Sequence, residues 1–149
     1  QCAELCGRDH GFMPIVVNVV EEADYKTWMA DKQAEAAEIK KLMEQTFSMD
    51  ELVERGKTVY NRSCVACHGA NGEGGVGKPI ANSPIATGEV AQQINVLVNG
   101  VPGTAMQAFG GQLNDVDLAA VVTYTRNAFG NNMGDKVQPI DVYNFKKGQ

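Results

Sequence analysis

The sequence predicts a mainly helical fold in which most of the chain forms one small domain. Apolar residues recur at helical spacing in several segments, which is the primary sign of amphipathic helices. Polar caps followed by acidic residues mark helix starts near positions 48 and 114. The length of 149 residues allows one modest core, so any second domain must be partial.

Composition excludes several broad classes. A hydrophobic fraction of 44% and a charged fraction of 21% are ordinary for a globular chain, so disordered, collagen-like and disulfide-scaffold classes are not expected. The net charge of -5 argues against a nucleic-acid partner, because phosphate binding needs clustered Lys and Arg. No stretch approaches the roughly 18 apolar residues of a membrane helix. The chain opens without Met or a signal peptide, and we expect a fragment or a processed product.

The first helix of the main domain is predicted from 48 to about 61. Ser48 and Glu51 form a capping box, which satisfies free amides at a helix start. An apolar stripe at helical spacing follows, made of Leu52, Val53, Gly56, Val59 and Tyr60. Gly56 is small enough for a second helix to approach closely, and Tyr60 or Tyr124 is expected at that crossing.

Two further helices are predicted downstream. One covers about 89 to 99. The other begins near the Asn114 cap and stops at Gly130. This last helix is the expected partner of the helix at 48 to 61.

The segment between Cys64 and His68 reads C-x-x-C-H, the signature of covalent c-type haem attachment. In this motif two thiols add to the haem vinyl groups, and the adjacent His is delivered to the iron. A redox C-x-x-C or half of a zinc site are the alternatives. Zinc would need a second ligand pair, and the other histidine, His10, lies in a different cluster. The sequence therefore predicts one covalent haem held by Cys64, Cys67 and His68.

The stretch from 69 to 84 is rich in Gly and punctuated by Pro. It does not fit a phosphate-binding loop, because Gly77-Lys78-Pro79 lacks the required Ser or Thr. We interpret it as a loop that wraps the proximal side of the haem. A ligating His normally donates its other ring N–H to a backbone carbonyl, and we expect the Pro79 carbonyl to accept from His68.

Met106 is the candidate for the sixth iron ligand. It lies in a loop of small residues, 103 to 110, and no His follows His68. A Met is more often core filler, and we interpret four others in that way: Met29, Met43, Met49 and Met133. A His/Met pair fills both axial positions, which suits electron transfer rather than substrate binding.

Residues 48 to 133 resemble a class I cytochrome c domain, with helix, haem motif, proximal Pro, distal Met and final helix in order. The resemblance implies two thioether bonds, two axial ligands and a partly exposed haem edge; the residues are Cys64, Cys67, His68 and Met106. Gln107 departs from the family, since many relatives have Pro after the ligating Met. This removes a rigid residue from the Met106 loop.

The N-terminal cluster points to a different metal. Cys2, Cys6, His10 and Met13 offer soft sulfur and imidazole within one short loop, a set that suits copper. The alternative is a Cys2–Cys6 disulfide with a solvated His10. The continuation at 14 to 20 is predicted to be a buried β-strand.

Residues 1 to about 22 closely resemble the C-terminal end of the cupredoxin domain in subunit II of haem-copper cytochrome c oxidases. The resemblance implies a binuclear copper centre, CuA, with two bridging thiolates, one further side-chain ligand for each copper and a weak backbone carbonyl contact; these are Cys2, Cys6, His10, Met13 and Glu4. The family's other copper-binding His comes from an earlier strand. Because His68 is committed to haem, this piece is expected to hold haem but no intact copper centre.

Four segments are predicted: a cupredoxin remnant at 1 to 21, a helical linker at 22 to 47, the cytochrome c domain at 48 to 133 and a tail at 134 to 149. The linker either sets the haem-to-copper distance or packs on the haem domain. The strand at 14 to 20 has lost its sheet, so it is either disordered or pairs with another copy. Lys146 and Lys147 in the tail are interpreted as solvated.

A cytochrome c domain behind a CuA loop implies subunit II of a caa3-type terminal oxidase, a proton-translocating oxidoreductase. In the implied relay a donor cytochrome or an upstream respiratory complex reduces the haem, the haem reduces CuA, and CuA feeds subunit I. The fragment itself is an electron-transfer domain. The attachment chemistry and the resemblance lead us to expect it on the periplasmic face of the bacterial inner membrane, held there only through N-terminal helices that precede this piece.

Two alternatives remain. The cytochrome tail of a nitrous-oxide reductase also joins CuA to haem, although the sequence at 13 to 17 is closer to the oxidases. Upstream membrane helices would indicate an oxidase, and an upstream propeller the reductase. A haem gas sensor or small peroxidase would need an open sixth position, and Gln107 is the hint in that direction.

Overall fold

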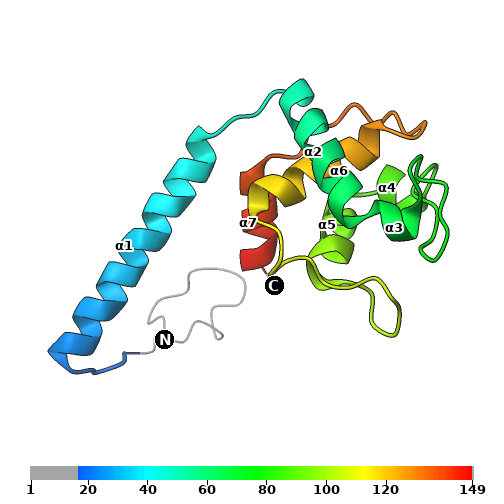
Figure 1. Cartoon of the computed structure of the whole chain (residues 1–149). Helices are drawn as coiled ribbons and strands as arrows, with labels where there is room; N and C mark the ends of the chain where they lie inside the picture. Colours follow the sequence, from blue (N-terminus) through cyan, green and yellow to red (C-terminus); the bar gives the residue numbers. More distant parts are fainter. Residues whose placement is uncertain (1–16, 149) are drawn as a thin grey trace, which may run out of the picture. The chain divides into compact units, whose positions relative to one another are not determined.

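The computed structural model describes residues 17–148, and the regular structure within that range is helical, with no strand (Figure 1). The helices are α1 (Glu22–Glu44), α2 (Met49–Ser63), α3 (Val65–His68), α4 (Pro84–Thr87), α5 (Val90–Asn99), α6 (Asp115–Asn127) and α7 (Pro139–Lys147). The chain divides after residue 38 into two compact units. The predicted mainly helical fold is confirmed. No helix in the described range combines the length and apolar character needed to cross a bilayer.

In the first unit the predicted strand is absent from its described part. Residues 17–21 have no regular structure, and Val17 and Val19 are 80% and 94% exposed. A strand needs a neighbour for its backbone hydrogen bonds, and the described residues supply none. The prediction of a buried strand is therefore wrong for 17–20, and positions 14–16 lie outside the described range.

The predicted linker helix is confirmed as α1, although it ends at Glu44. The expected pair between Glu22 and Lys26 is present at 2.6 Å on the exposed surface. The rings of Tyr25 and Trp28 stack with their centroids 5.9 Å apart, and both residues are about half exposed. Since exposed ion pairs contribute little, the helix gains at most about 0.5 kcal/mol from the Glu22–Lys26 pair.

The second unit is built on the crossing of α2 and α6. A Cβ atom at Gly56 would overlap the carbonyl oxygen of Ala120 and lie 2.5 Å from Cβ of Tyr124. Only a glycine therefore lets the two backbones approach this closely. Tyr60 and Tyr124 pack at the crossing with ring centroids 5.7 Å apart, as predicted.

The predicted caps fix where these helices begin. Ser48 N–H donates to Glu51 Oε2 over 2.8 Å, and the Ser48 hydroxyl accepts from Glu51 N–H over 3.3 Å. Hydrogen bonds from Ser48 lower the pKa of Glu51. At α6 the Asn114 side chain accepts from Asp117 N–H over 2.8 Å. Both starts agree with the prediction.

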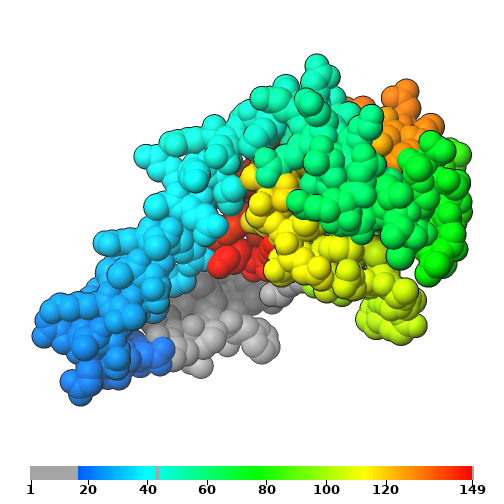
Figure 2. Space-filling model, viewed as in Figure 1, coloured from blue at the N-terminus to red at the C-terminus, as the bar shows by residue number. Residues whose placement is uncertain are grey.

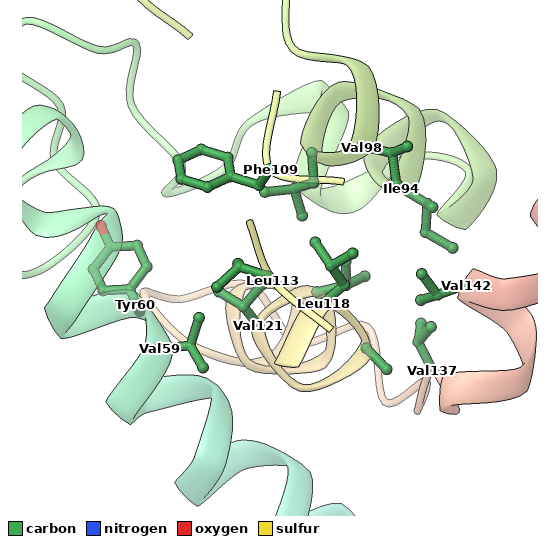
Figure 3. Close-up of a cluster of buried hydrophobic side chains, with 13 residues drawn as sticks. Val59, Tyr60, Ile94, Val98, Phe109, Leu113, Leu118, Val121, Val137 and Val142 are labelled. Atoms are coloured by element: carbon green, nitrogen blue, oxygen red, sulfur yellow. The ribbon is translucent and has the colours of Figure 1, made fainter. Parts of the chain in front are cut away.

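Apolar side chains from α2, α5, α6 and α7 meet in one core (Figure 3). This core cluster consists of Val59, Tyr60, Ile94, Leu97, Val98, Phe109, Leu113, Leu118, Ala119, Val121, Val122, Val137 and Val142. Partly buried residues pack against it, and these include Cys64 and Met106. The core therefore supports both segments that carry the predicted haem ligands.

The C-terminal segment is part of the packed domain. Val137 and Val142 are fully buried, and the Gln138 side chain bonds both the N–H and the C=O of Phe47 at 3.0 Å. Lys146 Nζ lies 2.6 Å from Asp115 Oδ1 and 3.1 Å from the Gly110 carbonyl. The prediction that Lys146 is solvated is therefore wrong. Its ammonium reaches the start of α6, a placement that sequence spacing does not show.

A buried arginine joins α6 to three other segments. Arg126 is 2% exposed and makes a two-pronged ion pair with Asp135, at 2.9 Å and 2.7 Å. Its Nη1 also donates to the Ala86 carbonyl and to Gln93 Oε1. The hydrogen bonds from Arg126 hold the pKa of Asp135 below its ordinary value. This network therefore connects α6 with α4, α5 and the loop after α6.

Candidate functional site

The haem-attachment motif lies on a single helical turn directly after α2. Cys64 N–H donates to the Tyr60 carbonyl over 2.8 Å, and the Cys64 carbonyl accepts from Cys67 and His68 at 3.1 Å and 3.0 Å. Residues three apart on a helix share a face, so this turn presents both thiols together. Neither cysteine is part of a disulfide. The predicted motif residues are therefore together on α3 and its cap.

Burial favours the protonated form of the Cys64 thiol. Burial, with a smaller contribution from Cys67, raises the pKa of Cys64 to about 11. Reactive C-x-x-C pairs instead require a thiol pKa at or below neutral pH, because the thiolate is the nucleophile. Cys64 would therefore be a poor nucleophile in a redox pair. A zinc site would need further ligands, and residues 17–148 hold no group of three His, Cys, Asp or Glu side chains placed for a metal.

The ring of His68 is held by one backbone carbonyl. His68 Nδ1 lies 2.8 Å from the Lys78 carbonyl oxygen. A carbonyl only accepts, so Nδ1 carries the proton and Nε2 is left for a metal. The predicted acceptor, the Pro79 carbonyl, is wrong by one residue. Because a residue before proline is restricted to extended conformations, Pro79 instead fixes the direction of the Lys78 carbonyl.

The proximal loop, residues 69–83, lies against the haem motif as predicted. Gly77 N–H donates to the Cys67 carbonyl and Gly74 N–H to the His68 carbonyl, both over 2.8 Å. A Cβ at Gly77 would lie 2.8 Å from Cε1 and 2.9 Å from Nδ1 of His68. The loop backbone therefore touches the imidazole, and a side chain at Gly77 would displace the ring.

An aromatic cluster of Tyr60, Tyr124 and Phe129 lies next to this loop, close to Gly69 and Gly72. Their ring centroids lie 5.0 to 5.7 Å apart. The Tyr60 hydroxyl donates to the Gly69 carbonyl over 2.8 Å. Burial raises the pKa of Tyr60 to about 12, so the phenol keeps its proton and remains a donor at neutral pH. The cluster thus connects α2, α6 and the residue after His68.

The Met106 loop, residues 100–108, is closed by its own hydrogen bonds. Val101 N–H donates to the Met106 carbonyl over 2.9 Å. The Thr104 hydroxyl donates to the Val101 carbonyl over 2.8 Å and accepts from Met106 N–H over 3.2 Å. These bonds restrain the loop where Gln107 replaces a family proline. Thr104 was missed by sequence reasoning, although a Gly-Thr pair in a turn is a signal for such a bond.

The donor set fits a covalent haem. It offers two thiols on one turn, an imidazole whose Nε2 is free for iron, and a Met packed on the same core cluster as Cys64. The proximal loop and the Met106 loop both lie at the surface of the second unit (Figure 2), where Val76 is 80% and Val101 is 37% exposed. The predicted copper ligands lie outside the described residues, so they stay predictions: Cys2, Glu4, Cys6, His10 and Met13.

Comparison with known proteins shows similarity over the segment that contains these residues. The family described as cytochrome c oxidase, cbb3-type, subunit III matches residues 51–124. Dihydro-haem d1 dehydrogenase of Pseudomonas aeruginosa is 37% identical over 73 residues, which are 49% of this chain and 15% of that protein. The cbb3-type cytochrome c oxidase subunit CcoP of Azospirillum brasilense is 34% identical over 85 residues, 52% of this chain and 28% of that protein.

A third relative is of a different kind. A probable cytochrome c oxidase subunit 2 of Rickettsia bellii is 54% identical over 37 residues, 25% of this chain and 14% of that protein. The chain thus spans less than a third of the length of each of these relatives. Residues 51–124 are similar to the cytochrome c domain of cbb3-type subunit III, and this similarity implies covalent haem c and supports haem-based electron transfer as the function.

Proposed function

We propose that this cytochrome c domain holds its haem through Cys64 and Cys67, with His68 and Met106 as the two axial ligands. The observation that carries the proposal is the bond from His68 Nδ1 to the Lys78 carbonyl, which places the proton on Nδ1 and leaves the Nε2 lone pair for iron. The haem, when bound, supplies one-electron chemistry at its iron.

The side chains would keep that chemistry restricted to electron transfer. Met106 and His68 would together hold the iron, and neither oxygen nor another substrate would then have a place to bind. The Met106 loop is restrained by Thr104 and Val101, which opposes opening of the sixth position. The raised thiol pKa of Cys64 reflects an apolar setting, which suits a thioether better than a thiolate.

Replacing Met106 with Ala is expected to abolish the weak long-wavelength absorption band of iron–thioether ligation in the ferric protein. The variant should become high-spin and bind carbon monoxide when reduced, because its sixth position is open. The optical spectrum of the purified haem-loaded protein measures both effects. Met133→Ala is the matched control, since Met133 is 40% exposed and lies in the loop after α6. If the wild-type protein is already high-spin or binds carbon monoxide when reduced, the relay proposal is wrong and a gas sensor or peroxidase is favoured.

We further propose that the parent protein is subunit II of a caa3-type oxidase, in which this haem passes electrons to CuA. The short match to an oxidase subunit 2 supports this, together with the copper-type ligand set near the N-terminus. The proposed partners are a donor cytochrome c or an upstream respiratory complex, the CuA domain and oxidase subunit I. The proposed location is the periplasmic face of the inner membrane.

In the full-length oxidase, His10→Ala is expected to remove the CuA absorption and to block reoxidation of the haem by oxygen. Reduction of the haem by its donor should continue at the normal rate, because in the proposed relay CuA receives electrons only after the haem has been reduced. Stopped-flow absorption at the haem and copper bands separates the two steps. Reoxidation at the wild-type rate in a copper-free variant would contradict the relay.

A further inference from the structure

The proximal loop is attached to the end of α6 by one buried amide side chain. Asn131 is 3% exposed. Its Nδ2 donates to the Ile80 carbonyl over 3.1 Å and to the Thr125 carbonyl over 2.8 Å. Its Oδ1 accepts from Asn82 N–H over 2.7 Å. The side chain therefore joins two backbone positions of the loop to the last turn of α6.

The attached segment is next to the carbonyl that holds His68. Ile80 follows Lys78 with only Pro79 between them, and proline fixes its own φ and restricts the residue before it. Ile80 N–H and Ala81 N–H both donate to the Gly72 carbonyl, over 2.8 Å and 3.0 Å. A shift of Ile80 is therefore passed on to the Lys78 carbonyl, because the intervening proline has little freedom to absorb it.

We propose that Asn131 is a positioning residue for the haem ligand His68. It keeps the Lys78 carbonyl aligned with His68 Nδ1 by anchoring the loop two residues further along. The hydrogen bond that Nδ1–H donates strengthens the imidazole as an electron donor to iron, so this anchor also tunes the reduction potential. The inference rests on the proposed ligation by His68.

The experiment follows the Nδ1 proton itself. In reduced haem-loaded Asn131→Ala protein, we expect the His68 Nδ1–H to exchange with solvent on the order of tenfold faster, the change expected for loss of about one hydrogen bond. The reduction potential should rise, because a less basic imidazole stabilises the ferric state less. NMR of the ring proton and optical titration of the potential measure the two effects.

Asn127 provides a matched control. It lies at the same end of α6, and its side chain also makes three hydrogen bonds, to Thr123, Asp135 and Gly134. Those partners belong to α6 and to the segment after it, not to the proximal loop. Asn127→Ala should therefore cost similar stability and leave the His68 proton exchange and the potential unchanged.

A second variant, Asn131→Asp, keeps the test decisive if Asn131→Ala does not fold. Asn131→Asp has nearly the same shape and keeps the acceptor for Asn82, but it replaces the donor to Ile80 and Thr125. It should also speed the exchange at His68. If both Asn131 variants match Asn127→Ala, the residue is merely structural and the inference is overturned. A wild-type spectrum without His-ligated low-spin haem would instead overturn the proposed function, and this inference with it.

Discussion

Replacing Gly56 with Ala is expected to destabilise the haem-loaded second unit by about 2 kcal/mol. The new methyl group would overlap the Ala120 backbone, which cannot rotate away, so α2 and α6 must separate. Overpacking of this kind costs up to about 3 kcal/mol. The better helix propensity of Ala returns about 1 kcal/mol. The overlap therefore outweighs the propensity, and urea unfolding measures the difference.

Gly111→Ala is the control for that substitution. A Cβ at Gly111 would meet nothing within 4 Å, and its backbone is outside the left-handed region. The same chemical change should therefore be neutral or stabilising by up to about 1 kcal/mol. If Gly56→Ala proved as harmless as Gly111→Ala, the close crossing of α2 and α6 would be wrong.

Replacing Arg126 with Ala is expected to cost about 3 to 5 kcal/mol of unfolding free energy. The change leaves the Asp135 carboxylate, the Gln93 amide oxygen and the Ala86 carbonyl without their common donor. The Asp135 side chain is 38% exposed and regains water, but each buried acceptor left without a donor costs about 1 to 3 kcal/mol. Urea unfolding of the haem-loaded variant at neutral pH measures the loss.

Arg55→Ala is the matched control. Arg55 pairs with Asp117 at 2.7 Å, but its side chain is 45% exposed. An exposed pair of this kind contributes at most about 1 kcal/mol. Equal effects at the two positions would show that burial of Arg126 does not set the strength of its pair.

The Arg126 pair also predicts how acid weakens the fold. Because the pKa of Asp135 is lowered in the folded protein, its contribution is fully present above the ordinary carboxyl pKa of about 3.9 and is lost as pH falls through the lowered value. The gap between wild type and Arg126→Ala should therefore shrink in acid. A gap that stays constant down to pH 2 would contradict this assignment.

Local patterns predicted the helices that carry the site. The capping box at Ser48, the cap at Asn114 and the small residue at Gly56 each act within one helix or at one crossing, so their spacing in the sequence is enough to reveal them. The C-x-x-C-H motif is likewise contained in a single turn. The sequence by itself therefore determined four of the helices and the position of the haem motif, whereas α4 and α7 were not predicted. The copper ligands that it predicts near the N-terminus stay predictions.

Only the tertiary structure decided which distant groups meet. The carbonyl that holds His68 belongs to Lys78, because the direction of a backbone group depends on the path of the whole loop. Arg126, Asn131 and Lys146 look like ordinary polar residues in the sequence, yet folding places each beside carbonyls or carboxylates far along the chain. Conversely, the apolar run before α1 predicted a buried strand, but Val17 and Val19 are exposed. A strand is completed by neighbours in space, whereas a helix completes its hydrogen bonds within its own sequence.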